Sequence, residues 1–183
     1  MIIRDARPND IDAITAIYNH AVAHTTAIWN ETLADREDRL AWLVQRQGAG
    51  WPVLVAVDPR ETILGYATYG PWRPHEGYRH TVEHSVYVDP AQQGKGVGTL
   101  LMRALIDRAR AQKMHVMVGG IEAGNMASLR LHEALGFERT GLLKEVGMKF
   151  GRWLDLAFLQ LTLDRRSPED AHPSSDCNSN NRR

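Results

Sequence analysis

Three glycines at alternate positions, Gly94, Gly96 and Gly98, constrain this chain more than any other feature. The apolar segment 81–88 precedes them, and apolar residues at helical spacing follow from Leu100 onward. A glycine-rich turn between a strand and a helix brings backbone N–H groups together at the positive end of the helix dipole, which suits an anion. The glycine spacing alone leaves open a tight turn that binds nothing.

The same spacing argues against two nucleotide-binding turns. The dinucleotide fingerprint needs glycines at relative positions one, three and six, but beyond Gly98 the chain continues with Thr99 and Leu100. The P-loop needs Ser or Thr directly after its Gly-Lys pair, whereas Lys95 is followed by Gly96. A nicotinamide cofactor and an ATP-hydrolysing site are therefore disfavoured.

The hydrophobic pattern predicts an α+β fold in one domain, residues 1–164. The expected order is β-α-α-β-β-β-α-β-α-β-β. We expect strands at 2–6, 52–58, 62–69, 81–88, 115–121, 139–146 and 153–163, and helices at 11–22, 35–47, 100–112 and 125–135. Residues 165–183 have almost nothing apolar to bury, so we expect a disordered polar C-terminal tail.

Charge and cysteine content narrow the possible partners. The 22 Lys and Arg balance the 22 Asp and Glu, which argues against a nucleic-acid or acidic membrane surface. No window approaches the roughly 20 apolar residues of a membrane span, and Met1 to Asp5 lack the order of a signal peptide. The lone Cys177 fits a reducing cytoplasm. The histidines lack a zinc-binding spacing, so we predict no metal site.

Segment 93–98 reads Gln-x-x-Gly-x-Gly, and here the sequence resembles the GNAT acetyltransferase superfamily, whose signature wraps the pyrophosphate of acetyl-CoA. Asn125, Ser128, His132 and the pair Gly136-Phe137 look like the second family motif. The resemblance covers residues 1–164 through the element order. Three segments are similar to the phosphinothricin acetyltransferases, a group that includes methionine sulfoximine and methionine sulfone acetyltransferases: 83–88, 131–137 and 147–155.

This resemblance implies a mixed sheet with helices on both faces, splayed between the fourth and fifth strands. The exposed backbone of 86–88 would bind the pantetheine arm, and an N–H there, that of Val88, would face the thioester oxygen. The alternative is an ordinary buried strand. The resemblance gives these cofactor-binding residues: Val86, Tyr87, Val88, Gln93, Gly94, Lys95, Gly96, Val97, Gly98, Thr99, Asn125 and Ser128.

Two side chains are the catalytic candidates. By resemblance, Glu83 is the base that accepts the proton of the acceptor ammonium, directly or through a water. His132 stands where many family members have a tyrosine that protonates the thiolate. It would serve as the acid or shape the substrate pocket. The alternatives are a solvated glutamate and a hydrogen-bonded histidine on a helix face.

Four residues of the loop after segment 62–69 are expected to bind the acceptor: Trp72, Arg73, Tyr78 and Arg79. The arginines suit a carboxylate or phosphinate, although each is also compatible with a surface charge. Segment 25–29 is expected to add selectivity.

Together these features predict an acetyl-CoA-dependent enzyme. The substrate would be a small amino-acid analogue of the phosphinothricin, methionine sulfoximine or methionine sulfone type, acetylated on its α-amino group. The alternatives are a protein N-terminal or lysine acetyltransferase and a non-catalytic acyl-CoA-binding module. The resemblance also implies a homodimer, and the aromatic and apolar residues of the C-terminal strands offer an interface at Phe150, Trp153, Phe158 and Leu159.

Overall fold

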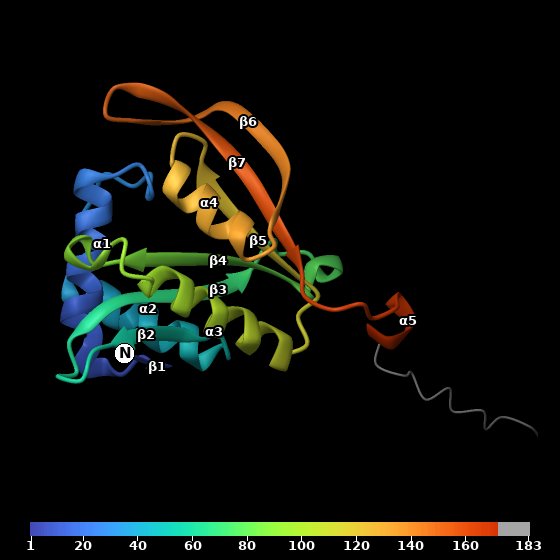
Figure 1. The fold of residues 1–183 in the computed structure, drawn as a ribbon, viewed down its shortest axis with the longest axis horizontal. Helices are drawn as coiled ribbons and strands as arrows, with labels where there is room; N and C mark the ends of the chain where they lie inside the picture. Colours follow the sequence, from blue (N-terminus) through green and yellow to red (C-terminus); the bar gives the residue numbers. More distant parts are fainter. Residues whose placement is uncertain (172–183) are drawn as a thin grey trace, which may run out of the picture.

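A seven-stranded mixed sheet, strongly twisted, forms the centre of the molecule (Figure 1). The computed structural model describes residues 1–171. The strands are β1 (Ile2–Asp5), β2 (Val53–Val57), β3 (Ile63–Pro71), β4 (Thr81–Val88), β5 (Val116–Glu122), β6 (Glu138–Lys149) and β7 (Arg152–Thr162). The helices are α1 (Ile11–His24), α2 (Arg36–Gly48), α3 (Val97–Ala111), α4 (Met126–Ala134) and α5 (Pro168–Ala171). Up to β7 the predicted α+β order is confirmed, with short 3-10 turns added.

The strand order is β1-β2-β3-β4-β5-β7-β6, and the β4–β5 pair is parallel. This pair is short: Thr81, Val82 and Glu83 face Val116, Met117 and Val118 in that order. Beyond Glu83, β4 keeps its register with β3 up to Val88 but has no partner on β5. The predicted splay is therefore confirmed, and it leaves one backbone edge of β4 available to a ligand.

Two layers of helices cover opposite faces of the sheet. The α3 and α4 side packs around Leu101, Leu105 and Leu129, and the α1 and α2 side packs around Ile14 and Leu43. All five of these side chains are buried. Side chains on β4 alternate between the two layers, because successive residues of a strand point to opposite faces. Val82, Val86 and Val88 join the first layer and Tyr87 joins the second.

The hairpin of β6 and β7 is longer than the sequence pattern indicated and projects beyond α4 (Figure 1). The sequence predicted that its first strand ends at residue 146, but β6 continues to Lys149. A bulge explains the difference, because the register steps from Leu143 to Gly147 on β6 while β7 advances only two residues. Glu145 has a positive φ of 53° and donates its backbone N–H to Asp155. The bulge breaks the alternation on which strand prediction depends.

Part of the expected disordered tail is described by the structure. Arg166 donates to the carbonyl of Lys113 at 2.6 Å, and a short helix, α5, follows. His80 Nε2 lies 3.2 Å from the carbonyl oxygen of Ala171. Residues 165–171 therefore differ from the expectation, since polar contacts with the domain take the place of apolar burial. Residues 172–183 of the expected tail, with Cys177, lie outside the described residues.

Candidate active site

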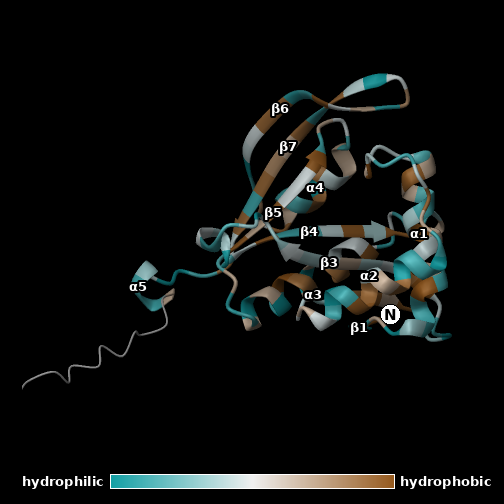
Figure 2. Ribbon diagram, turned by 180° about the vertical axis from the view of Figure 1, so that it is seen from behind, coloured by the Kyte–Doolittle hydropathy of each residue, from teal (hydrophilic) through white to brown (hydrophobic). Residues whose placement is uncertain are grey.

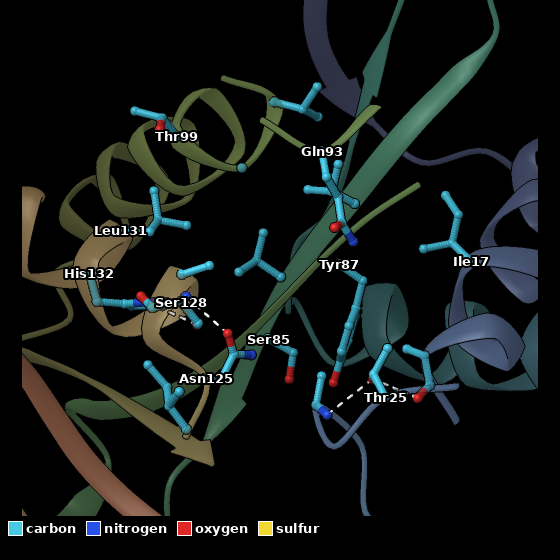
Figure 3. Close-up of a pocket in the computed structure, with 18 of the residues that line it drawn as sticks. Ile17, Thr25, Ser85, Tyr87, Gln93, Thr99, Asn125, Ser128, Leu131 and His132 are labelled. Atoms are coloured by element: carbon cyan, nitrogen blue, oxygen red, sulfur yellow. Dashed lines mark hydrogen bonds between the residues drawn. The ribbon is translucent and has the colours of Figure 1, made fainter. Parts of the chain in front are cut away.

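A cavity of about 580 Å³ opens where β4 and β5 separate. Figure 3 shows Asn125, Ser128 and His132 of α4 on one side of β4, and Ile17 and Thr25 on the other. Eleven of the twelve residues predicted to bind the cofactor line this cavity: Val86, Tyr87, Val88, Gln93, Gly94, Gly96, Val97, Gly98, Thr99, Asn125 and Ser128. The two motifs, about 30 residues apart in sequence, thus face a single space.

The glycine turn has the geometry of an anion-binding cradle. Gly94 and Gly96 have φ angles of 73° and 81°, a left-handed conformation that other residues adopt at a cost. Gly96 caps α3, so the N–H groups of Val97, Gly98 and Thr99 in the first turn have no partner within the helix. These donors and the helix dipole suit the diphosphate of coenzyme A.

Lys95 is the exception among the predicted cofactor residues. Its side chain is exposed and does not line the cavity. The ammonium donates to the carbonyl of Ala91 at 2.8 Å and to Oε1 of Gln92 at 3.2 Å. Because these contacts close the preceding turn, the backbone carries the anion-binding geometry without this side chain.

Asn125 begins α4 as its cap. Its Oδ1 accepts the N–H of Ser128 at 3.1 Å (Figure 3). The cap uses the oxygen of the amide, so the NH₂ group remains a donor for a cavity ligand. Capping and ligand binding are therefore compatible in this one side chain.

His132 stacks on a second buried histidine, His84 of β4, which the sequence analysis did not single out. Their ring centroids are 4.8 Å apart, and Phe137 packs edge-on against both rings. His132 Nδ1 lies 2.7 Å from the carbonyl oxygen of Ser128. A carbonyl only accepts, so Nδ1 carries the proton and Nε2 carries the lone pair. Burial lowers the pKa of His132 and lowers that of His84 to about 3, so both rings are neutral at pH 7.

Glu83 points to the opposite face of the sheet from this histidine pair. It does not line the large cavity itself. However, its Oε1 lies 3.3 Å from the position that a Cβ on Gly120 would take, and Gly120 lines that cavity. Burial raises the pKa of Glu83, and Arg73 and Arg46 oppose that rise. A raised pKa suits a carboxylate that exchanges protons near neutral pH. The structure does not bring Glu83 and His132 together.

A second cavity, of about 350 Å³, lies on the Glu83 side of the sheet. Trp72, Tyr78 and Phe158 line it, together with Val118, the residue opposite Glu83 in the β4–β5 pair. The rings of Trp72 and Phe158 meet edge to face at 5.5 Å. Two of the four residues predicted to bind the acceptor thus share an aromatic cavity beside Glu83.

The two predicted arginines have different environments. The exposed guanidinium of Arg73 lies 4.6 Å from the centre of the ring of Trp72, which lines the second cavity, but Arg73 itself lines neither cavity. Arg79 is exposed, lines neither cavity, and donates to the carbonyl of Glu76 at 3.1 Å. The structure therefore gives Arg79 a role in closing its own turn and supplies no geometry for substrate binding.

The loop after α1 forms one wall of the large cavity through Thr25 and Ala27. Lys149 of β6, only 2% exposed, holds this loop. Its ammonium donates to the carbonyls of Val22 at 2.6 Å, Thr25 at 2.8 Å and Ile28. The sequence analysis gave Lys149 no role, because its acceptors are backbone groups more than 120 residues away in the chain.

Comparison with known proteins decides the family. The family model described as "Acetyltransferase (GNAT) family" matches residues 14–137. The chain belongs to the GNAT acetyltransferase family. A L-methionine sulfoximine/L-methionine sulfone acetyltransferase from Pseudomonas aeruginosa is 60% identical over 162 residues, which is 88% of this chain and 94% of the relative. A phosphinothricin N-acetyltransferase from Alcaligenes faecalis is 41% identical over 163 residues, covering 88% of this chain and 82% of its own.

A solved GNAT structure shows the same fold with its cofactor. This putative acetyltransferase from Salmonella typhimurium, determined with acetyl-CoA, has a TM-score of 0.90 and 54% identity, covering 96% of this chain and 98% of its own. This GNAT chain is thus an N-acetyltransferase that uses acetyl-CoA. Within residues 1–171, no helix is long and apolar enough to cross a membrane. In the same range, no cluster of three or more His, Cys, Asp or Glu side chains has a metal-binding arrangement.

Proposed function

We propose that this enzyme acetylates the α-amino group of a small amino-acid analogue of the methionine sulfone, methionine sulfoximine or phosphinothricin type. The names of the relatives support this substrate class. The observation that carries the proposal is the position of Glu83, between a cavity lined by the cofactor motifs and a small aromatic cavity beside Arg73. A carboxylate and a guanidinium beside an aromatic recess suit a zwitterion with a short side chain.

The cofactor side holds coenzyme A through backbone groups. The N–H groups at the start of α3 bind the diphosphate, the unpaired edge of Val86 to Val88 binds the pantetheine arm, and Asn125 donates to it. Acetyl-CoA supplies an activated thioester. The N–H of Val88 stabilises charge on the thioester oxygen.

On the acceptor side, Glu83 prepares the nucleophile. An amine is mostly protonated at neutral pH, so its nitrogen must first lose a proton. That proton passes to the carboxylate of Glu83, and the neutral nitrogen attacks the carbonyl carbon. A C–N bond forms, the C–S bond breaks, and the second proton lost by nitrogen ends on the sulfur. The products are the acetamide and the free thiol.

His132 shapes the cofactor side of the site in this proposal. Its Nδ1 proton is committed to the carbonyl of Ser128, and Nε2 is buried without a hydrogen-bond partner among residues 1–171. A neutral ring with its one proton already donated is a poor acid. Of the two roles expected for His132, the geometry favours the pocket role over protonation of the thiolate.

Protein acetylation is the competing function. A protein acceptor needs room for an extended chain, whereas the recess beside Glu83 has a volume of about 350 Å³, which suits a small acceptor. A non-catalytic acyl-CoA-binding module would not need a carboxylate of raised pKa beside the ligand. Both features favour catalysis on a small amine.

We also propose that the enzyme is a homodimer formed through the β6–β7 hairpin. Hydrophobic residues occur along the ribbon of this hairpin (Figure 2), and six of its side chains are at least 45% exposed: Leu142, Leu143, Val146, Met148, Phe150 and Trp153. An apolar surface on a projecting hairpin is typical of a protein interface. Of the predicted interface residues, Leu159 is fully buried in the core and Phe158 packs on Trp72, so Phe150 and Trp153 are the remaining candidates. Trp153→Glu should shift the mass measured by light scattering from dimer to monomer; a wild-type monomer would contradict the proposal.

An acceptor screen tests the proposed function. Thiol release from acetyl-CoA is measured with methionine sulfone, methionine sulfoximine, phosphinothricin and peptides that carry a free N-terminus or lysine. We expect turnover with the amino-acid analogues and background rates with the peptides. Faster acetylation of any peptide would overturn the assignment, and binding of acetyl-CoA without acetylation of any acceptor would favour the binding module.

A further inference from the structure

Arg46 of α2 extends its side chain toward the central sheet. Its guanidinium packs on the backbone of Gly70, where a Cβ would collide with it. Gly70 is the residue of β3 that pairs with Glu83. The guanidinium of Arg46 on α2 therefore lies against the β3 backbone next to Glu83, the proposed base.

The charges around Arg46 are not balanced by an ion pair. Nη1 of Arg46 is buried and has no hydrogen-bond partner in the described part of the chain. Burial lowers the pKa of Arg46, Arg39 lowers it further, and Glu83 raises it. Within residues 1–171, neither Arg46 nor Arg39 has a carboxylate within 4.0 Å. Arg46 is half-buried, and a buried guanidinium nitrogen without a partner is costly, so this arginine is expected to meet an anion when the site is in use.

Glu83 thus has a guanidinium on two sides. Arg73 belongs to the loop after β3 and stacks on Trp72, and Arg46 belongs to α2; neither lines the second cavity, but both lower the pKa of Glu83. In an α-amino acid the carboxylate is one carbon away from the amine, so a cation near the base is within reach of that carboxylate. The side chain of the acceptor then extends to the aromatic cavity, on the Arg73 side.

We propose that Arg46 binds the α-carboxylate of the acceptor and thereby selects amino acids over simple amines. This inference rests on the proposed function, because it assigns a recognition group to the same acceptor site. Arg46 presents a planar pair of N–H donors that matches a carboxylate. The cation also offsets the negative charge that the acceptor brings to Glu83.

The test compares two acceptors that differ only in the carboxylate. Methionine sulfone has it, and 3-(methylsulfonyl)propylamine lacks it. We expect Arg46→Met to lower kcat/KM for methionine sulfone by about 10- to 100-fold, the range for loss of a charge-assisted hydrogen bond. For the decarboxylated amine we expect a change within about twofold, and the KM for acetyl-CoA should not change. Arg36→Met is the matched control on the same helix, because Arg36 is exposed and pairs with Asp12.

Other outcomes separate this inference from the proposed function. Equal losses for both acceptors would mean that Arg46 acts through Glu83 or through the fold, and an unchanged preference would remove it from recognition; either result overturns the inference. Failure of the wild type to acetylate methionine sulfone would instead overturn the proposed function. Should Arg46→Met not fold, Arg46→Lys decides, because it keeps the charge but not the planar pair of donors. It should lower kcat/KM for methionine sulfone several-fold more than kcat/KM for the decarboxylated amine.

Discussion

β4 presents Val86 to one side of the sheet and Glu83 to the other, and the two sides differ in how they are built. The cofactor motifs are short continuous segments, the glycine turn with the start of α3 and the start of α4, and α1, the loop after it, β4 and β5 complete the cavity. The acceptor side comes from α2, the loop after β3, β5 and β7, which are far apart in sequence. The first recognises a constant ligand through backbone groups, and the second recognises an acceptor through charged and aromatic side chains.

This difference predicts how substitutions will act. On the cofactor side, changes should weaken acetyl-CoA binding and leave the intrinsic rate of transfer nearly intact. On the acceptor side, changes should lower turnover or acceptor affinity while acetyl-CoA binds normally. A variant that mixes the two effects would show that β4 does not separate the two sites.

The largest effect is expected at Glu83. Glu83→Gln keeps the shape of the side chain but cannot accept a proton, so kcat should fall by about 10²- to 10⁴-fold, the usual range for a general base. The acetyl-CoA dissociation constant from a fluorescence titration should stay within about twofold. Retention of more than a tenth of the wild-type kcat would exclude Glu83 as the base.

The same variant should be at least as stable as the wild type at pH 7. The folded state raises the pKa of Glu83, so the stability that comes from this group is present at low pH and is lost as pH rises through the folded pKa. Gln cannot lose a proton, so its melting temperature should not show this part of the pH dependence. A lower melting temperature at pH 7 would mean that ionised Glu83 stabilises the fold.

A substitution of Lys149 tests whether this side chain, on the β6–β7 hairpin, holds the loop after α1 that forms one wall of the large cavity. Lys149→Met keeps the length of the side chain but leaves three backbone carbonyls without their donor, so the free energy of unfolding should fall by about 3 kcal/mol. Chemical denaturation measures this loss. Arg103→Met, an exposed change on α3 away from the hairpin, is the control and should lower the free energy of unfolding by less than about 0.5 kcal/mol. Equal stability of both variants would show that Lys149 does not hold the loop.

Gly96 tests the cofactor side. Gly96→Val places a β-branched residue at a φ of 81°, which is strained, and the turn should shift away from its anion-binding shape. The acetyl-CoA dissociation constant should rise by about 10- to 100-fold, whereas kcat at saturating acetyl-CoA should fall by no more than about threefold. Unchanged affinity in a calorimetric titration would mean that the diphosphate binds elsewhere.

The smallest effect is expected at His132. His132→Phe keeps an aromatic ring against His84 and Phe137. If the ring shapes the cavity, kcat should fall by no more than about tenfold, below the usual contribution of a general acid. Stopped-flow measurement of thiol release checks this. A fall of a hundredfold or more would restore His132 as the acid that protonates the thiolate.

The cofactor side of the molecule was easier to predict from the sequence than the acceptor side. The splay and the glycine turn were predictable because strand, turn and helix signals lie next to one another in the chain. The position of the Lys95 side chain was not predictable, because this exposed side chain turns back to donate to the carbonyl of Ala91. The strand that ends at Lys149 was cut short because a bulge shifts its alternation.

The acceptor side was predicted less well, because its side chains meet only in the folded molecule. Of the residues that the sequence assigned to the acceptor, Trp72 and Tyr78 line one cavity, whereas Arg79 bonds within its own turn. Arg46 had a detectable signal: Arg39 and Arg46 flank Leu43 at helical spacing, so two charges share the stripe of a buried leucine. His84 had no local signal beyond its place in an apolar strand.

The pH dependence of acetyl transfer by the wild type and by Glu83→Gln, at saturating acetyl-CoA and methionine sulfone, tests the central claim most directly. The wild-type rate should fall as pH drops through a carboxylate pKa above its ordinary value of 4.5, because Glu83 must be ionised to take the proton. The variant should be slow throughout and should lack that acid limb. An identical acid limb in both proteins would contradict the assignment of Glu83 as the base that acts across β4 from the cofactor.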